Sequence, residues 1–336
     1  MRVLLACGAL AVAAAFGATE AAAQSTTLKI ATFTPARGLM ATDILDPWLT
    51  KMEQDAGGDL KFEKYYGGTL SRDPSQYLKL TQDQVTDMAH VVSHYTIGRF
   101  PDDDLFNLPN LFRNAEEASL AYRRLIDKNL LRGYDGLQVL GVFTTGPAGI
   151  HTKPPIKSLA DVKGLKLRTS GEGLTEAGKH LGAVGVPLPA PAVAENIQRG
   201  VIDGTMLDWT AIKLFRIQEV AFYHLDVNLG VIPNAVVINT KSYEKLSAKA
   251  KAAATKHGGD EFARVTGKYN DASDVENREA LAKDPKHTLI ALSAADKAQV
   301  EKVLLPMHGE WKKARPNGEK LYAELQTILA ELRARK

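Results

Sequence analysis

The chain has 336 residues, which is long enough to form two domains with separate hydrophobic cores. Hydrophobic residues make up 45% of it and charged residues 24%, which is typical of globular proteins. The net charge of +3 is small and the lysines and arginines are spread along the chain, so we expect no nucleic-acid partner.

The N-terminus has the features of a secretory signal peptide, predicted over residues 1–23. Arg2 supplies the positive start, residues 3–16 form an apolar, alanine-rich stretch, and small residues offer a cleavage site before Gln24. No apolar stretch is long enough for a membrane span, so we expect a periplasmic protein with no direct membrane insertion. Cys7 stands in a sequence like a lipoprotein cleavage box, but the six residues before it are too few for a signal. Because Cys7 is the one cysteine, the mature chain has no disulfide, thiolate zinc ligand or cysteine nucleophile.

The first half of the chain alternates predicted strands with predicted helices. The strands are expected over residues 28–33, 60–66, 88–92 and 137–143. The helices between them are expected over residues 41–55, from the N-cap pair Asp73-Pro74, and over residues 116–131. This order predicts an α/β domain with a mostly parallel sheet.

A second block begins near His151. It contains a strand that ends near Arg168, helices over 172–181, 193–199 and 209–218, a short strand that ends near Leu207, and an apolar strand over 234–239. Residues 248–283 predict a helix interrupted near Gly258-Gly259, and residues 318–335 a terminal amphipathic helix. Ser293 and Asp296 form an approximate capping box that opens one more helix.

The segment SLADVKGLKLRTS, residues 158–170, places one arginine at a typical ligand position. Leu165 and Leu167 alternate with Lys166 and Arg168, which turns the leucines toward the core. Arg168 therefore emerges at the carboxyl end of a strand, where open α/β sheets bind ligands. A guanidinium group binds a carboxylate through two parallel hydrogen bonds, which a lysine cannot do. The alternative from the residues alone is a structural salt bridge.

Six segments in a fixed order give the chain a resemblance to a known family. They are LKIATF at Leu28, GGTLSRDPSQYLKLTQDQVTDMAHV at Gly67, LPNLFRNAEEA at Leu108, SLADVKGLKLR at Ser158, IQRGVIDG at Ile197 and NAVVINTKSYEKL at Asn234. With them the chain resembles the DctP-type solute-binding proteins of tripartite ATP-independent periplasmic (TRAP) transporters over nearly all of its mature length.

The resemblance implies a two-lobe periplasmic-binding-protein fold. Each lobe would be a mostly parallel sheet flanked by helices, with a long helix that spans both lobes. Lobe I is expected over residues 24–147 plus 234–275, and lobe II over residues 148–233 plus 276–336. The strand over 234–239 would return to the first lobe, so repeated chain crossings would form a hinge between the lobes.

The resemblance also implies a carboxylate-binding cleft. In the family the arginine that matches Arg168 binds the carboxylate of an organic acid, and the position of Phe33 often contacts the ligand. Further candidate ligand-binding residues lie at predicted strand ends or crossings: Ser93, Tyr95, His151, Thr169, Asp208, Trp209 and Asn234. The alternatives are core packing for Phe33 and Trp209, a helix cap for Asp208, and a hydrogen-bonded loop histidine for His151.

Two departures from the sialic-acid-binding members of that family bear on the ligand. Ala148 stands where those members have a second arginine, and Leu207 lies nearest to their asparagine. We therefore expect a small organic acid with an apolar or aromatic body, and not a sugar acid. Lys153 or Arg37 could supply a second cation, which leaves a C4 dicarboxylate open as an alternative.

Enzyme signatures are absent from the sequence, which has no GxSxG, HExxH or P-loop motif. His90 and His94 have metal-ligand spacing only if they lie on a helix. Residues 102–104 are three consecutive aspartates, and we expect them to form a solvated loop and not a calcium site. We expect a receptor that needs no metal or cofactor and delivers its solute to the membrane subunits of a TRAP transporter. The alternatives are a binding protein for a non-carboxylate solute or metal, and a periplasmic hydrolase or lyase.

Overall fold

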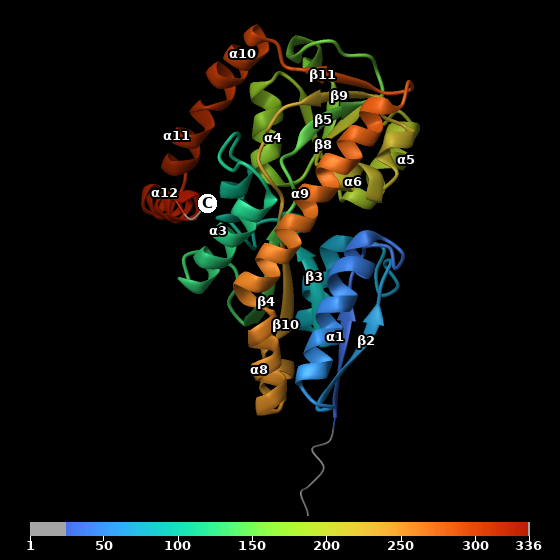
Figure 1. Ribbon diagram of the computed structural model, residues 1–336. Coiled ribbons are helices and arrows are strands. Elements are labelled where there is room, and N and C mark those ends of the chain that lie inside the picture. The colour runs from blue at the N-terminus through green and yellow to red at the C-terminus, as the bar shows by residue number, and fades with distance from the viewer. Residues whose placement is uncertain (1–24, 335–336) are drawn as a thin grey trace, which may run out of the picture.

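Two β-sheets, one above the other in Figure 1, organise the chain. The computed structural model describes residues 25–334, so the predicted signal peptide, residues 1–23, lies outside the described residues. The first sheet has the order β2-β1-β3-β10-β4 and the second β11-β9-β5-β8-β6-β7. The first consists of β1 (Thr26–Ala31), β2 (Leu60–Tyr65), β3 (Met88–Val92), β4 (Leu137–Thr144) and β10 (Pro233–Asn239). The second consists of β5 (Gly149–Thr152), β6 (Lys166–Thr169), β7 (Val184–Pro187), β8 (Gly204–Leu207), β9 (Tyr223–Asp226) and β11 (Thr288–Ala291).

In each sheet one strand runs against the others. β10 is antiparallel to β3 and β4, whereas β1 pairs in parallel with β2 and β3. In the second sheet β5 is antiparallel to β8 and β9, and the remaining pairs are parallel. Every residue of β3 and β10 is buried, as expected for central strands covered on both faces. The predicted α/β fold with two mostly parallel sheets is confirmed.

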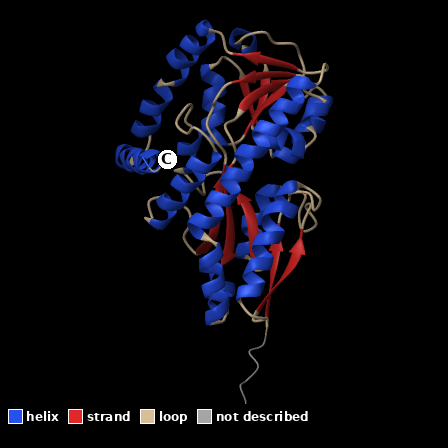
Figure 2. Ribbon diagram, in the orientation of Figure 1, coloured by secondary structure: helices blue, strands red, loops and turns tan. Residues whose placement is uncertain are grey.

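Helices flank both sheets (Figure 2). In chain order they are α1 (Asp46–Asp55), α2 (Tyr77–Gln82), α3 (Ala115–Asp127), α4 (Gly171–His180), α5 (Val193–Gln198), α6 (Trp209–Leu214), α7 (Thr240–Glu244), α8 (Ala248–His257), α9 (Gly259–Lys283), α10 (Ala294–Leu304), α11 (Pro306–Lys313) and α12 (Gly318–Ala334). Short 3-10 turns include η3 (Ser93–Tyr95), η4 (Asp103–Asn107) and η5 (Leu159–Val162). None of the described helices is long and apolar enough to cross a membrane.

Helix α3 shows how the local sequence builds one of these layers. Asn114 caps its first turn by accepting a hydrogen bond from the Glu117 amide at 2.9 Å. Ala118, Ala121 and Leu125 recur at helical spacing and are fully buried, so one face of α3 packs inward. This face covers β4, and α9 packs beside it.

The chain crosses between the sheets through paired segments. Residues 145–148 lead from β4 to β5, and residues 227–232 lead from β9 back to β10. The two segments are hydrogen-bonded to each other, with Thr145 N to Ile232 O at 3.1 Å and Ala148 N to Gly230 O at 2.8 Å. The crossings are therefore short and hydrogen-bonded to each other, and the hinge between the lobes stays a prediction.

Helix α9 runs alongside both sheets, as the family resemblance implies (Figure 1). It contacts α3 and β4 at the first sheet and α6 and β11 at the second. The interruption predicted near Gly258-Gly259 separates α8 from α9. At that junction Gly258 lies so close to the Leu140 carbonyl that a Cβ would sit 2.4 Å from its oxygen, which explains the glycine.

The C-terminal helices bind back onto both halves of the molecule. α10 contacts α4, whereas α12 contacts α3. Arg333 on α12 forms hydrogen bonds of 2.9 and 2.7 Å with the two carboxylate oxygens of Glu117 on α3. The lobe boundaries, with residues 276–336 in lobe II, stay a prediction.

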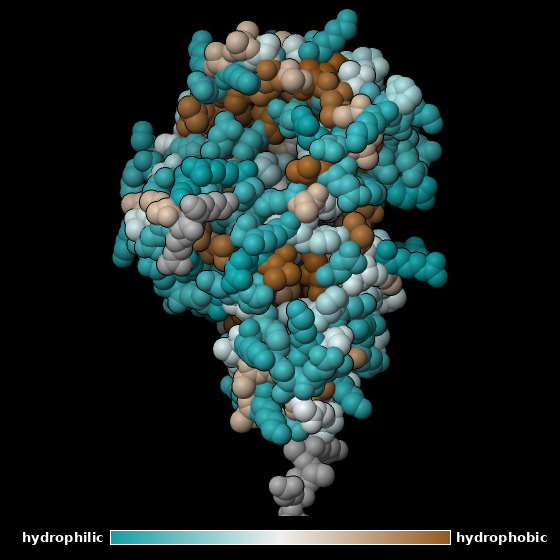
Figure 3. All heavy atoms as spheres, in the orientation of Figure 1, coloured by the Kyte–Doolittle hydropathy of each residue, from teal (hydrophilic) through white to brown (hydrophobic). Residues whose placement is uncertain are grey.

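In Figure 3 hydrophobic side chains gather between α10 and the second sheet, and most of this face is hydrophilic.

The structure differs from the sequence analysis mainly in the second half of the chain. Strands β5, β7, β9 and β11, four residues each, were not predicted because so short a run has no clear alternation. The helix expected over 209–218 ends at Leu214, because Arg216 adopts a left-handed conformation with φ of 56°.

Candidate functional site

Arg168 lies on β6, a strand inside the second sheet between β7 and β8. The turn η5 that precedes it carries a capping box between Ser158 and Asp161. The corner before β6 turns at Gly164, whose φ of 82° belongs to the left-handed region that favours glycine. The strand and the position of its arginine follow the sequence prediction.

The guanidinium group of Arg168 is completely buried. Nε donates a hydrogen bond to the Leu188 carbonyl at 2.6 Å, and Nη2 donates one to the Tyr95 hydroxyl at 3.1 Å. Nη1 has no hydrogen-bond partner among the described residues, and none of their carboxylates forms a salt bridge with this arginine. The alternative of a structural salt bridge therefore finds no support in residues 25–334.

Tyr95 joins the two halves of the molecule at Arg168. It ends η3, directly after β3 of the first sheet, and its hydroxyl oxygen accepts hydrogen bonds from Arg168 Nη2 and from the Ala190 amide at 3.0 Å. The hydroxyl hydrogen is then left to donate to another acceptor. The Phe33 ring lies 6.2 Å from the Tyr95 ring and stacks on Phe215 at 6.4 Å, so aromatic groups from both halves lie together here.

A cleft of about 1090 Å³ opens between the carboxyl ends of β3 and β6. Its walls include three of the predicted ligand-binding residues, Ser93, Tyr95 and Thr169. Gly171 in the same wall has a φ of 80°, and a Cβ there would sit 2.8 Å from the His94 ring. Only glycine allows the start of α4 to approach the other half this closely.

Asn234 belongs to a hydrogen-bonded chain beside the cleft. Its Oδ1 lies 2.9 Å from His90 Nε2, and His90 Nδ1 lies 3.1 Å from the Thr32 hydroxyl. Because the amide oxygen can only accept, Nε2 carries the hydrogen and Nδ1 accepts one from Thr32. Burial lowers the pKa of His90 to about 4, so the ring is neutral at pH 7. His90 also stacks on Phe33 at 5.0 Å.

His151 lies in a chain of three imidazole rings inside the second sheet. Its Nε2 donates to the Leu207 carbonyl at 3.0 Å, so its Nδ1 must accept from His224 Nδ1 at 2.8 Å. His224 Nε2 in turn accepts from His287 Nδ1 at 2.9 Å. Burial lowers the pKa of His151 to about 4. His151 does not line the cleft between β3 and β6.

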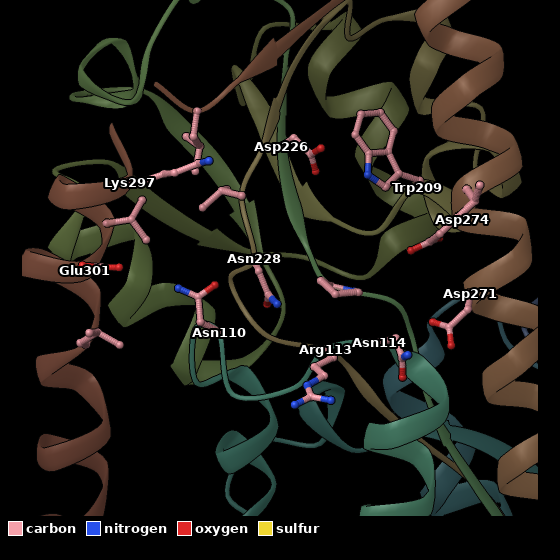
Figure 4. A pocket seen from close by; sticks show the side chains of 16 residues that line it. Asn110, Arg113, Asn114, Trp209, Asp226, Asn228, Asp271, Asp274, Lys297 and Glu301 are labelled. Carbon is pink, nitrogen blue, oxygen red and sulfur yellow. The ribbon is translucent and has the colours of Figure 1, made fainter. Parts of the chain in front are cut away.

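Asp208 and Trp209 stand at the start of α6. Asp208 is buried, and its Oδ1 accepts a hydrogen bond from the Ala211 amide at 2.9 Å, so it caps this helix. Burial raises the pKa of Asp208 to about 6. Trp209 packs edge-on against His151 at 4.8 Å. It also lines a second pocket of about 890 Å³ between α9 and α10, where Asp226 and Asp274 lie on either side of it (Figure 4).

The structure thus brings Ser93, Tyr95 and Thr169 to the wall of one cleft. Arg168 does not line this cleft and lies buried behind Tyr95, to which it is hydrogen-bonded, and Phe33 contacts the Tyr95 ring. Asn234, His151 and Asp208 do not line this cleft, and Trp209 lines the other pocket. All nine stay predictions as ligand contacts. Sequence reasoning missed Phe215, whose contact with Phe33 becomes visible only when the two halves meet, and Ser170, a cleft residue that directly follows Thr169.

The three aspartates expected in a solvated loop are buried, and that expectation is wrong. Asp102 accepts hydrogen bonds from Arg132 Nε and Nη2 at 2.8 and 2.6 Å, and Asp104 accepts one from Arg315 Nη2 at 3.0 Å. Asp103 accepts one from the Tyr134 hydroxyl at 2.7 Å, and burial raises its pKa to about 7. Partners that are distant in the sequence explain the burial. No group of three or more metal-ligating side chains within residues 25–334 could hold a metal ion.

Comparison with known proteins adds a family and several relatives. The family described as bacterial extracellular solute-binding protein, family 7, matches residues 30–314. The chain is 26% identical over 264 residues to the C4-dicarboxylate-binding periplasmic protein DctP of Rhodobacter capsulatus, a match that covers 77% of this chain and 78% of that protein. The first curated relative, from Salmonella typhimurium, is matched over only 62% of its length.

Two solved structures resemble the molecule over almost their whole length. One is a TRAP solute-binding protein of an unidentified marine microbe, specific for aromatic acid ligands and bound to 3-hydroxybenzoate. It is 29% identical with a TM-score of 0.85, and the match covers 91% of this chain and 98% of that chain. The other is a TRAP solute-binding protein of Rhodoferax ferrireducens with copurified benzoate. It is 27% identical with a TM-score of 0.86 and the same coverage.

Proposed function

The chain belongs to family 7 of the bacterial extracellular solute-binding proteins, the substrate-binding receptors of TRAP transporters, and we propose that its cleft binds a small organic acid through Arg168. The acid's carboxylate accepts two hydrogen bonds from the guanidinium group. Tyr95, Ser93 and Thr169 complete its polar surroundings. The role is binding and delivery to the membrane component, without catalysis.

The buried and unpaired charge of Arg168 is the observation that carries this proposal. Taking a guanidinium group out of water costs several kcal/mol unless an anion and hydrogen bonds compensate. Here the guanidinium group donates to two neutral oxygens, Leu188 O and Tyr95 OH, and Nη1 lacks a partner. No carboxylate of the described residues forms a salt bridge with it. A ligand carboxylate supplies the missing negative charge, and the low dielectric of the site strengthens the pair.

We further propose that the acid has an apolar or aromatic body. Tyr95 adjoins Arg168, the Phe33 ring lies against Tyr95, and Phe215 stacks on Phe33, so ring surface gathers on this side of the arginine. Ala148, at the position of a second arginine in sialic-acid binders, is fully buried and its backbone bonds belong to the hinge. The relatives that bind 3-hydroxybenzoate and benzoate support this class. The relative from Rhodobacter capsulatus keeps a C4 dicarboxylate as the alternative, although neither Lys153 nor Arg37 lines the cleft.

Ligand binding between the lobes favours their closed arrangement, and the membrane component recognises that state. Small-angle scattering with saturating ligand should give a smaller radius of gyration than the free protein. An unchanged radius would count against closure. The periplasmic location rests on cleavage after residue 23, so the intact mass of the exported protein should correspond to a chain that begins at Gln24 and carries no lipid.

A thermal-shift and calorimetric panel tests the function. The panel contains benzoate, 3-hydroxybenzoate, mandelate, pyroglutamate, succinate, malate and sialic acid. A ligand at 100 times its Kd stabilises the folded protein by about 2.7 kcal/mol. We expect an aromatic monocarboxylate to bind most tightly. Tightest binding of succinate or malate would reveal a second cation, tightest binding of sialic acid would refute the ligand class, and no binding of any acid would refute the function.

A further inference from the structure

A buried ion pair forms part of the wall of the cleft between β3 and β6. Asp104 of η4 is 8% exposed, and its Oδ2 accepts a hydrogen bond from Arg315 Nη2 at 3.0 Å. Its Oδ1 accepts a hydrogen bond from the Gly173 amide of α4 at 3.4 Å and lies 3.5 Å from His94 Nε2. Asp104, Arg315 and His94 all line the cleft. The pair therefore belongs to the surface that a solute in the cleft meets.

Arg315 is held in this position by more than its carboxylate partner. It belongs to the segment between α11 and α12, and its Nε donates a hydrogen bond to the Pro101 carbonyl at 3.0 Å. Its guanidinium group also lies over the Trp311 ring, 4.7 Å from the ring centre. If Asp104 lost its charge, these contacts would still hold the Arg315 cation at the cleft wall, with Nη2 free to bind another anion.

The other cations of the cleft wall are exposed and already paired. Among the described residues they are Arg132 and Lys179. Arg132 Nε and Nη2 donate hydrogen bonds of 2.8 and 2.6 Å to Asp102, and Lys179 forms an ion pair with Glu176. Burial lowers the pKa of His94, so its imidazole group adds no charge at pH 7. Three carboxylates also line the cleft from exposed positions: Asp73, Glu172 and Glu176.

We propose that Asp104 makes the receptor selective for monocarboxylates, because it occupies Arg315 and presents its own negative charge to the cleft. The proposal rests on the proposed function, since it assumes that one solute carboxylate binds to Arg168. A second solute carboxylate would have to leave water and approach Asp104, whose cation is already paired. Like charges repel strongly in a site that is largely shielded from solvent. Dicarboxylates are therefore rejected by an unfavourable contact as well as by the lack of a free cation.

The charge of this pair can be changed in both directions. Asp104→Asn keeps the shape of the side chain and an acceptor oxygen for the Gly173 amide, and it frees Arg315 for a second solute carboxylate. Arg315→Gln has the opposite effect, because it leaves the Asp104 carboxylate without its cation. A hydrogen bond to a charged group contributes about 1.5–3 kcal/mol. We therefore expect the ratio of dicarboxylate Kd to monocarboxylate Kd to fall by about 10-fold to 150-fold in Asp104→Asn and to rise in Arg315→Gln.

Titration calorimetry on the whole mature protein at pH 7.5, where all these acids are ionised, measures the ratio. The monocarboxylates are benzoate, 3-hydroxybenzoate, mandelate and pyroglutamate. The dicarboxylates are succinate, malate and the three benzene dicarboxylates, which add a second carboxylate to benzoate at each ring position. Weak dicarboxylates are measured by displacement of a bound monocarboxylate. The tightest dicarboxylate is compared with the tightest monocarboxylate, and in the wild type we expect it to bind at least about tenfold more weakly.

Asp127→Asn is the matched control. Asp127 is an exposed carboxylate on α3 that pairs with Arg123 and does not line the cleft. The substitution makes the same change in net charge and also frees an arginine, but away from the solute. It should keep the wild-type ratio. A ratio that falls equally in this control would assign the effect to net charge and refute the role of Asp104.

Three other results would overturn the selectivity. A wild-type protein that binds a dicarboxylate as tightly as its best monocarboxylate refutes it and leaves the proposed function intact, whereas the absence of any binding refutes both. An unchanged ratio in a folded Asp104→Asn variant also refutes it. If that variant does not fold, Arg315→Gln decides, because an unchanged or lower ratio in a folded Arg315→Gln variant contradicts the proposal.

Discussion

Replacing Arg168 by methionine separates a binding arginine from a structural one. The substitution keeps a long side chain of similar volume in the fully buried position and removes the charge. If the solute carboxylate pairs with Arg168, the ligand loses a desolvated, hydrogen-bonded partner. Such a loss costs about 2–5 kcal/mol, which is roughly a 30-fold to 4000-fold increase in Kd.

The stability of the free protein should change far less. The variant loses two hydrogen bonds, from Nε to Leu188 O and from Nη2 to Tyr95 OH, each worth about 1.5–3 kcal/mol when the donor is charged. It also no longer buries a guanidinium group without an ion pair, which costs several kcal/mol. The two effects oppose each other, so we expect the free energy of unfolding to stay within about 2 kcal/mol of the wild type.

Titration calorimetry with the tightest-binding acid and urea unfolding of the ligand-free protein measure the two quantities. Lys166→Met is the matched control, because Lys166 lies on the same strand with an exposed side chain, and neither quantity should change in it. Wild-type affinity in a folded Arg168→Met variant would remove Arg168 from the site. A loss of more than about 5 kcal/mol of stability without ligand would show that Arg168 is structural.

Three further substitutions test individual contacts. Tyr95→Phe removes the hydroxyl that accepts from Arg168 Nη2 and the Ala190 amide, and should weaken binding about 10-fold to 100-fold by calorimetry; an unchanged Kd would contradict this. Glu117→Gln tests the attachment of α12. Burial opposes ionisation of Glu117, but hydrogen bonds from Arg333 and the Arg113 amide lower its pKa overall. The ionised carboxylate therefore stabilises the folded protein above about pH 4.5, and this stabilisation is lost as the pH falls further. In melting curves from pH 6 to 3, the melting temperature of the variant should depend less on pH than that of the wild type. His151→Gln tests the buried imidazole chain. Because burial lowers the pKa of His151 to about 4, the folded state loses stability as the pH falls from about 6.5 toward 4, by up to about 3 kcal/mol. An equally steep loss of stability in the variant would show that another group causes this pH dependence.

The sequence by itself determined what depends on neighbouring residues. The strand over 88–92 and the cap at Ser293 were predicted correctly, because periodicity and capping involve residues within one or two turns. The emergence of Arg168 at the end of a strand follows from the same local logic. The six ordered segments predicted the family, which the comparisons confirm.

Only the tertiary structure decided which distant residues meet. Tyr95 and Arg168 are 73 positions apart, and their hydrogen bond exists because the chain crosses from the first sheet to the second after β4 and brings β3 opposite β6. The return crossing, residues 227–232, inserts β10 antiparallel between β3 and β4. The burial of Asp103 likewise depends on Tyr134, a partner from a later segment. Such contacts are long-range consequences of topology and burial, and no local pattern around these residues encodes them.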